Sequence, residues 1–378
     1  MNSKFNFFKF TLTKHNKTMK KQLLTTALVS SILGFGITSA VAQTTVTGNL
    51  ELSYSATSNE GNATSTQKLK NVRGFGKESQ INIANKGKLS TGMDYAAGFS
   101  FEVDGIDTGS QGMWNENTYI DLTSGKTTIT IGADHIQNPD RNVTNLVGFG
   151  YLGIDGLNDV ISSYSKSVGS GYSAYGIGLV QDIGIGKISA NYMPDATGGA
   201  ASNDILNGLQ STQIDTAESQ VEVGFKGGLG VKGLDLGLFY NKQDKVAGTE
   251  ATANDIKGVR FDGSYNLGQV TVAFDYAKQE GITTGTGTTS AYTAGLNEHK
   301  MKSAGIAYAV NKDISLGYTY GVAETNAASK SDEKINLFAV GYNLGPVTAQ
   351  LQYKKVDNHA NVTGYDGEQV SARLATKF

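Results

Sequence analysis

The chain ends in the stretch 368-EQVSARLATKF-378, in which apolar and polar residues alternate. Val370 and Leu374 fall in one phase of this alternation, and Ser371 and Arg373 fall in the other. Successive side chains of a β-strand point to opposite faces of the sheet. The segment therefore predicts a strand with one apolar face and one polar face, which requires a different solvent on each side.

The same period of two recurs along much of the chain. It is seen in 93–103, 234–240, 259–267, 270–276, 314–322 and 347–353. Two kinds of connection take turns between the alternating runs. The short ones, rich in Asn, Asp and Gly as tight turns require, are 85–88, 124–126, 266–269, 311–313 and 343–346. The long polar ones are 58–74, 104–114, 136–156, 194–217, 244–256, 281–298, 324–333 and 357–366. We therefore expect short turns to join the strands at one end of the sheet and long loops to join them at the other.

Counting the runs predicts sixteen strands in a single domain. We place them at 44–57, 75–85, 91–103, 115–123, 127–135, 157–166, 172–181, 218–226, 233–243, 257–267, 269–280, 299–310, 313–323, 334–344, 346–356 and 367–378. Residues 186–194 are a seventeenth candidate. We assign them to a long loop, because single-chain bacterial barrels have an even number of strands.

Composition agrees with an all-β fold made of many short strands. The chain has 48 Gly, 18 Tyr and 15 Phe but only 3 Pro and no Cys. The prolines all lie between alternating runs, where they interrupt no ladder of hydrogen bonds.

The N-terminal region has the pattern of a secretory signal. Met19-Lys20-Lys21 supplies a basic start, 23–37 an apolar stretch, and 40-AVA-42 a cleavage site before Gln43. We expect residues 1–42 to be removed and residues 43–378 to form the barrel. The start codon is either Met1 or Met19, because 1–18 precede a complete signal.

Removing residues 1–42 takes away six lysines and no acidic residue, which lowers the basic residues from 32 to 26 against 34 acidic ones. This acidic balance argues against nucleic acid as a partner and permits a lumen that favours cations.

The polar face distinguishes a membrane barrel from a soluble sandwich, which also alternates. The outward set is aliphatic and aromatic, with tyrosines at strand ends, as in an interfacial girdle. The inward set carries charges that could not fill a dry core: Glu51, Asp94, Glu102, Asp235, Arg260, Asp262, Asp275, Arg373 and Lys377. The sequence therefore predicts an all-β transmembrane antiparallel β-barrel of sixteen strands with a water-filled lumen.

Several segments resemble the Gram-negative general porins between Gln43 and Phe378. They are the signal, 44-TTVTGNLELSYS-55, 72-VRGFGKES-79, 99-FSFEVDG-105 and the terminal aromatic residue. The resemblance implies a homotrimer of the outer membrane, embedded in its lipid and lipopolysaccharide. It also implies short periplasmic turns, a third long loop folded into the lumen, and a role for Phe378 as an assembly signal.

Porins of this family oppose a row of wall arginines to carboxylates of the third loop. The resemblance implies that Arg73 is the basic residue of the constriction and that Lys166 is the only substitute for the other wall arginines. The family's P-E-F-G-G loop motif is missing from 136–156, where Asp140, Arg141 and Asp155 stand instead. The strand phase adds Arg260 and Arg373 as lumen residues; alternatively, such charges pair with Asp262 or Asp275 without touching solute.

These observations predict a passive channel for small hydrophilic solutes and ions, mildly cation-preferring, with its opening narrowed by 136–156. An alternative is a barrel that serves as an adhesin or structural anchor with a blocked lumen, and a soluble secreted β-protein is a further rival. We expect no enzyme, metal or cofactor. His135, His299 and His359 are isolated, the 228-GLGVKG-233 match is a turn, and His135 near Asp134 is the only loose hint of a hydrolase.

Overall fold

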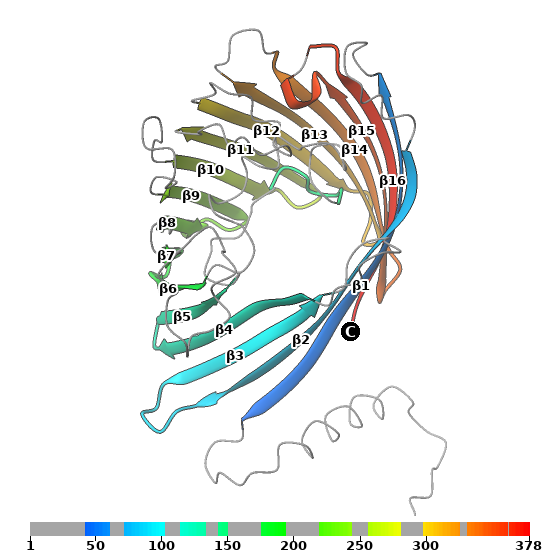
Figure 1. The fold of residues 1–378 in the computed structure, drawn as a ribbon. Coiled ribbons are helices and arrows are strands. Elements are labelled where there is room, and N and C mark those ends of the chain that lie inside the picture. The colour runs from blue at the N-terminus through cyan, green and yellow to red at the C-terminus, as the bar shows by residue number, and fades with distance from the viewer. Residues whose placement is uncertain are drawn as a thin grey trace, which may run out of the picture.

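The structure, a computed structural model, is a closed antiparallel β-barrel (Figure 1). It describes residues 42–60, 72–102, 114–133, 143–149, 175–193, 219–243, 256–280, 298–325, 331–361 and 363–378. Sixteen strands follow one another around the wall in chain order, and the last pairs with the first. The predicted fold class, antiparallel pairing and strand number are thus confirmed.

The strands have the following bounds along the chain. They are β1 (Gln43–Glu60), β2 (Val72–Lys88), β3 (Asp94–Glu102), β4 (Trp114–Ser124), β5 (Thr127–Ala133), β6 (Tyr175–Asp182), β7 (Lys187–Met193), β8 (Gln220–Gly227), β9 (Leu234–Gln243), β10 (Ile256–Asn266), β11 (Val270–Glu280), β12 (Glu298–Ala309), β13 (Ile314–Thr325), β14 (Glu333–Asn343), β15 (Val347–Asp357) and β16 (Asp366–Lys377). A short 3-10 helix, η3 (His359–Asn361), lies between the last two strands. Among the described residues, no helix is long and apolar enough to cross a membrane.

Short turns and long connections alternate along the chain, as the sequence predicted. The sequence pattern Asn-Leu-Gly makes two of the short turns in the same way. Gly268 and Gly345 have φ angles of 92° and 86°, which glycine adopts without strain. Their N–H groups donate to the side-chain oxygens of Asn266 and Asn343, both at 2.9 Å. All the short turns therefore lie at one rim of the barrel, and the strand ends that lead into the long connections lie at the other.

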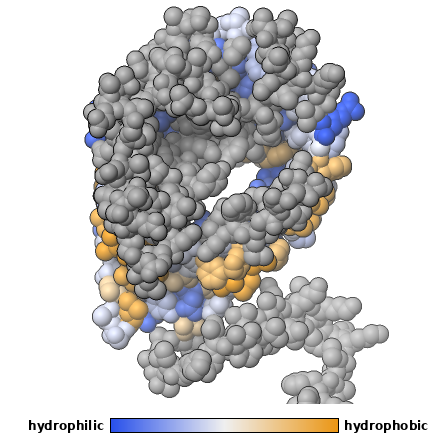
Figure 2. Space-filling view, viewed as in Figure 1, coloured by the Kyte–Doolittle hydropathy of each residue, from blue (hydrophilic) through white to orange (hydrophobic). Residues whose placement is uncertain are grey.

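Alternate side chains of each strand face opposite sides of the wall. Apolar side chains point outward and remain exposed, for example Leu238 and Phe338 at 53 % and Leu374 at 51 %. Figure 2 shows hydrophobic residues gathered on the outer wall. A hydrocarbon environment would cover these side chains, as the outer face of a membrane barrel requires.

The barrel closes where the two ends of the described chain meet. β1 and β16 pair from Asn49↔Lys377 to Glu60↔Asp366. One step further, the Phe378 N–H donates to the Gly48 carbonyl at 2.9 Å, and the Gly48 N–H donates to the Phe378 carbonyl at 2.8 Å. The terminal residue therefore completes the hydrogen-bond ladder of the seam.

One strand assignment from the sequence was wrong. Residues 186–194, which we expected in a loop, form β7 and pair with β6 and β8. The predicted strand 157–166 lies outside the described residues, and β5 pairs directly with β6, so no strand lies between them. The even strand number was correct, but counting 157–166 as a strand left 186–194 out of the sixteen.

Candidate pore constriction

Residues 143–149 of the third long connection lie inside the barrel against its inner wall (Figure 1). The Thr319 hydroxyl donates to the Thr144 carbonyl oxygen at 2.5 Å, and the hydroxyls of Thr144 and Ser303 share a hydrogen bond of 2.8 Å. The Gln350 amide donates to the Val147 carbonyl at 2.6 Å. These bonds come from β12, β13 and β15, so the segment is fixed to one side of the lumen.

Val147 also anchors this segment through apolar packing. Its side chain is 6 % exposed and belongs to a cluster with inward residues of β11 to β15. The cluster comprises Val147, Ala277, Met301, Ala323, Ile335, Leu337, Ala339 and Val356, with Leu146 and Ala307 at its edge. The sequence predicted a water-filled lumen but did not predict this apolar part of the inner wall. Here the inner wall forms an apolar core beneath the loop. Burial of these side chains stabilises the docked segment.

Inward glycines let the loop backbone approach the wall closely. A Cβ atom at Gly305 would lie 2.0 Å from the Thr144 carbonyl oxygen, and one at Gly317 would lie 2.8 Å from the Val147 Cβ. A Cβ at Gly341 would lie 3.3 Å from the Val147 Cγ1. Gly305, Gly317 and Gly341 therefore form a shallow groove on β12, β13 and β14 that receives the segment.

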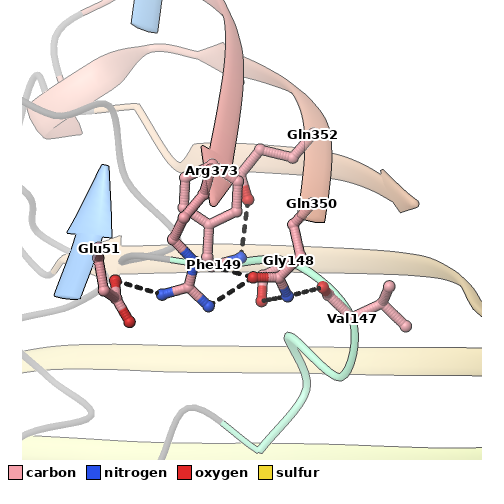
Figure 3. A network of polar contacts seen from close by, with 7 residues as sticks. All are labelled: Glu51, Val147, Gly148, Phe149, Gln350, Gln352 and Arg373. Atoms are coloured by element: carbon pink, nitrogen blue, oxygen red, sulfur yellow. Dashed lines mark hydrogen bonds and ion pairs between the residues drawn. The ribbon is translucent and has the colours of Figure 1, made fainter. Parts of the chain in front are cut away.

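Arg373 joins the loop to the seam of the barrel (Figure 3). Its guanidinium donates to the Glu51 carboxylate at 2.7 Å and to the Gln350 side-chain oxygen at 2.8 and 2.5 Å. It also lies over the Phe149 ring, with Cζ 4.9 Å from the centroid, and the Phe149 N–H donates to Gln352 at 3.0 Å. A planar guanidinium can make these in-plane bonds and this stacking contact at the same time. The network therefore orders the end of the docked segment, and Arg373 faces the lumen as predicted.

A different charge pattern marks the wall of β2, β3 and β4, away from the docked segment. Their inward positions include Glu78, Asp94, Glu102 and Asp121. Asp94 is paired with Lys88 at 2.6 Å, at the short-turn end. Among the described inward positions of these three strands there is no arginine. The four carboxylates outnumber the two described inward lysines of these strands, Lys86 and Lys88, so this part of the wall has a net negative charge.

Arg73 does not belong to the lumen, contrary to the prediction. It pairs with Ala56 in β1 and shares the phase of Phe75, which pairs with Tyr54 and is 73 % exposed on the outer face. The inward residues of this part of β2 are Gly74, Gly76 and Glu78. Arg73 has the same alternation phase as the apolar residues Ile81 and Ile83, which predicts an outward side chain. The prediction followed the resemblance to the family motif instead of this phase.

Arg260 faces inward but is buried, at 6 % exposure. Its Nε lies 3.4 Å from the Asp262 carboxylate, and its Cζ lies 4.4 Å from the Phe239 ring centroid. The alternative interpretation, in which an inward arginine pairs with Asp262, describes this residue. Asp140, Arg141, Asp155 and Lys166 lie outside the described residues.

The contacts that fix the loop were not among the predicted site residues. Thr144, Val147 and the three groove glycines carried no motif. One signal was present, because inward glycines recur on three consecutive strands at 305, 317 and 341. Among the described residues, no group of His, Cys, Asp and Glu side chains could hold a metal ion.

Comparison with known proteins places this geometry among outer-membrane channels. The sequence model described as Gram-negative porin matches residues 25–372. Curated proteins give no match. Among solved structures, an anion-selective porin from Comamonas acidovorans aligns with a TM-score of 0.63 at 13 % identity, over 89 % of this chain and 100 % of the other. OmpT of Vibrio cholerae aligns with a TM-score of 0.57 at 11 % identity, over 90 % and 99 %. A variant of the porin of Rh. blastica gives 0.54 at 13 % identity, over 89 % and 100 %.

Proposed function

We propose that this chain, which belongs to the Gram-negative porin family and forms a closed barrel of sixteen strands, is a channel rather than an enzyme. It conducts small hydrophilic solutes and ions by passive diffusion, with a mild preference for cations. The observation that carries this proposal is the position of 143–149. The segment is bonded to one side of the wall, which leaves the acidic side formed by β2, β3 and β4 uncovered by it.

The charge of the lumen supports the preference for cations. Among inward positions of the described strands, acidic residues outnumber basic ones. The acidic positions are Glu51, Glu78, Asp94, Glu102, Asp121, Asp182, Glu222, Asp235, Asp262, Asp275 and Glu333, and the basic ones are Lys86, Lys88, Lys187, Lys226, Arg260, Lys354, Arg373 and Lys377. Fixed charges act over ~8–10 Å at physiological salt, a distance comparable to the radius of a narrow pore.

The family context extends the proposal to the assembled protein. We propose a homotrimer with the long connections toward the cell exterior and the short turns toward the periplasm, surrounded by phospholipid and lipopolysaccharide. Residues 1–42 act as the removed signal, and the barrel comprises residues 43–378. Phe378 contributes to recognition by the assembly machinery through its exposed ring, which is 69 % accessible at the seam.

Planar bilayer recording of the purified protein tests the channel. We expect conductance steps, arriving in threes for a trimer, and a reversal potential in a potassium chloride gradient that indicates cation preference. The variant Glu78→Gln with Glu102→Gln removes two carboxylates of the acidic wall and should shift the reversal potential toward chloride. Lys312→Gln, in an exposed turn, is the control.

Two results would contradict this function. A bilayer that stays closed with correctly folded protein inserted would favour the anchor with a blocked lumen. A reversal potential of the opposite sign would refute the preference for cations and leave the channel itself intact.

A further inference from the structure

A cleft of about 560 Å³ opens at the short-turn rim of the barrel, between the β6–β7 and β8–β9 turns. Its lining includes Lys187, Lys226 and Lys232, together with Asp182 and Asp235. Lys126 approaches from the neighbouring turn, with its Nζ 3.9 Å from the position of a Cβ at Gly184. Basic groups therefore outnumber acidic ones around this cleft, whereas carboxylates predominate on the wall of β2, β3 and β4.

Lys187 and Lys226 are the central pair of this cluster. They are direct register partners on β7 and β8 and share the inward phase of Ser189 and Gly224. Both side chains are exposed, and no ion pair joins either ammonium to another described residue. Like charges directly opposite each other destabilise a pair of strands. This local cost is compensated if an anion binds between the two ammonium groups.

Two carboxylates, those of Asp182 and Asp235, also line the cleft. Asp182 is the register partner of Lys187 on the other side, and its Oδ1 accepts a hydrogen bond from the Gly184 N–H at 2.7 Å. Part of its acceptor capacity therefore stabilises the β6–β7 turn. Asp235 lies on β9, two residues before Gly237, the partner of Lys226. The two aspartates offset two of the four lysines, which leaves a net positive charge in the cleft.

Glycines hold the backbones of β7 and β8 close together beside the two lysines. A Cβ at Gly227 would lie 2.3 Å from the Cα of Gly186, and a Cβ at Gly186 would lie 2.6 Å from the Phe225 ring. The ends of β7 and β8 are in backbone contact at this level, one residue from each lysine. The strands cannot separate there without losing this packing, so the backbones of Lys187 and Lys226 stay directly opposite each other.

From these features we propose that the cleft is a binding site for small oxyanions with two or more negative charges, such as inorganic phosphate or a dicarboxylate. Ammonium groups donate strong charge-assisted hydrogen bonds to such oxygens. The cleft faces the lumen at the rim, so an anion can reach it from the short-turn side without passing the acidic wall. The site depends on the proposed channel only for this access.

Equilibrium binding of inorganic phosphate to the purified protein tests the site without any need for conduction. In phosphate-free detergent buffer, titration calorimetry and ³¹P line broadening should show saturable binding. Lys187→Gln with Lys226→Gln should weaken binding about tenfold or more, because each replacement removes charge-assisted hydrogen bonds to the anion. Lys312→Gln, at another short turn where Lys312 lies 3.3 Å from Asp313, should bind as the unaltered protein does.

Competition experiments test which chemical class the site binds, and an arginine variant distinguishes loss of the site from misfolding. Succinate should compete with phosphate if the site recognises paired negative charge, whereas competition by neutral glucose would contradict the proposal. Lys187→Arg with Lys226→Arg should retain binding while the glutamine variant loses it. Absence of saturable binding, or unchanged binding in the folded glutamine variant, overturns the site even if the channel conducts.

Discussion

The replacement Gly305→Ala is expected to displace the docked segment from the wall. The new Cβ would stand 2.0 Å from the Thr144 carbonyl oxygen, and ordinary van der Waals contact begins near 3.4 Å. The loop backbone must therefore move by about 1.4 Å toward the lumen. The opposing atoms are backbone atoms of Thr144, so no rotation of a side chain can relieve the overlap.

The energetic consequence follows from the bonds that this movement breaks. The Thr319 bond to the Thr144 carbonyl is 2.5 Å long and the bond between Thr144 and Ser303 is 2.8 Å, so both exceed bonding distance after such a shift. Each contributes about 0.5–1.5 kcal/mol, so docking should weaken by about 1–3 kcal/mol. A change of about 1.4 kcal/mol alters the ratio of docked to undocked loop tenfold.

Single-channel recording and solute swelling assays in liposomes measure the outcome. We expect a smaller main conductance, because the segment protrudes further into the lumen, together with more frequent closures and slower sugar entry. Thr319→Val, which removes one of the two bonds without a steric push, should increase the closures but leave the main conductance unchanged. If Gly305→Ala matched the unaltered protein in conductance, closure frequency and melting temperature, the assignment of the groove would be refuted.

Three further changes address other parts of the barrel. Arg373→Lys retains the charge but loses the fork of hydrogen bonds and the contact with Phe149, so unfolding free energy should fall by about 1 kcal/mol in thermal denaturation; an unchanged melting curve would contradict the network. Deletion of Phe378 removes both backbone bonds to Gly48 and should slow assembly of heat-modifiable barrel on gels, whereas Phe378→Ala retains the bonds and should be milder. Burial raises the pKa of the Tyr365 phenol in the last long connection, so the folded state favours the neutral phenol. Its stabilising contribution is complete below the ordinary phenol pKa of about 10 and is lost as the pH rises from there toward the higher folded value. The difference between the 295 nm absorbance titrations of the unaltered protein and of Tyr365→Phe should show this delayed ionisation; a difference curve centred at the ordinary phenol pKa would contradict it.

Much of the barrel could be predicted from the sequence, because lipid and water impose a strict alternation on each strand. Both solvents act along the whole of β16, and its predicted bounds differ from the observed ones by one residue at each end. The alternation also marked 186–194 as a candidate for β7, but the requirement for an even strand number assigned this segment to a loop. A count of strands cannot decide which short segment joins a sheet, since pairing partners determine that.

The docking of residues 143–149 was harder to predict because its contacts join segments distant in sequence. Thr144 meets Ser303 and Thr319 only after the barrel has closed, and no local pattern encodes that meeting. Arg73 shows the opposite difficulty, since a matching motif suggested a role that strand phase contradicts. Arg373 was placed correctly because phase alone determined its side of the wall.

The one-sided attachment of the loop has a consequence for how this protein could evolve. Docking contacts lie on β12 to β15, whereas Glu78 and Glu102, which we propose to favour cations, lie on β2 and β3. Under the proposed function, replacing Glu78 or Glu102 would change ion selectivity without disturbing the residues that hold the loop. Natural selection could adjust what enters the cell through one flank of the pore while the other flank preserves its architecture.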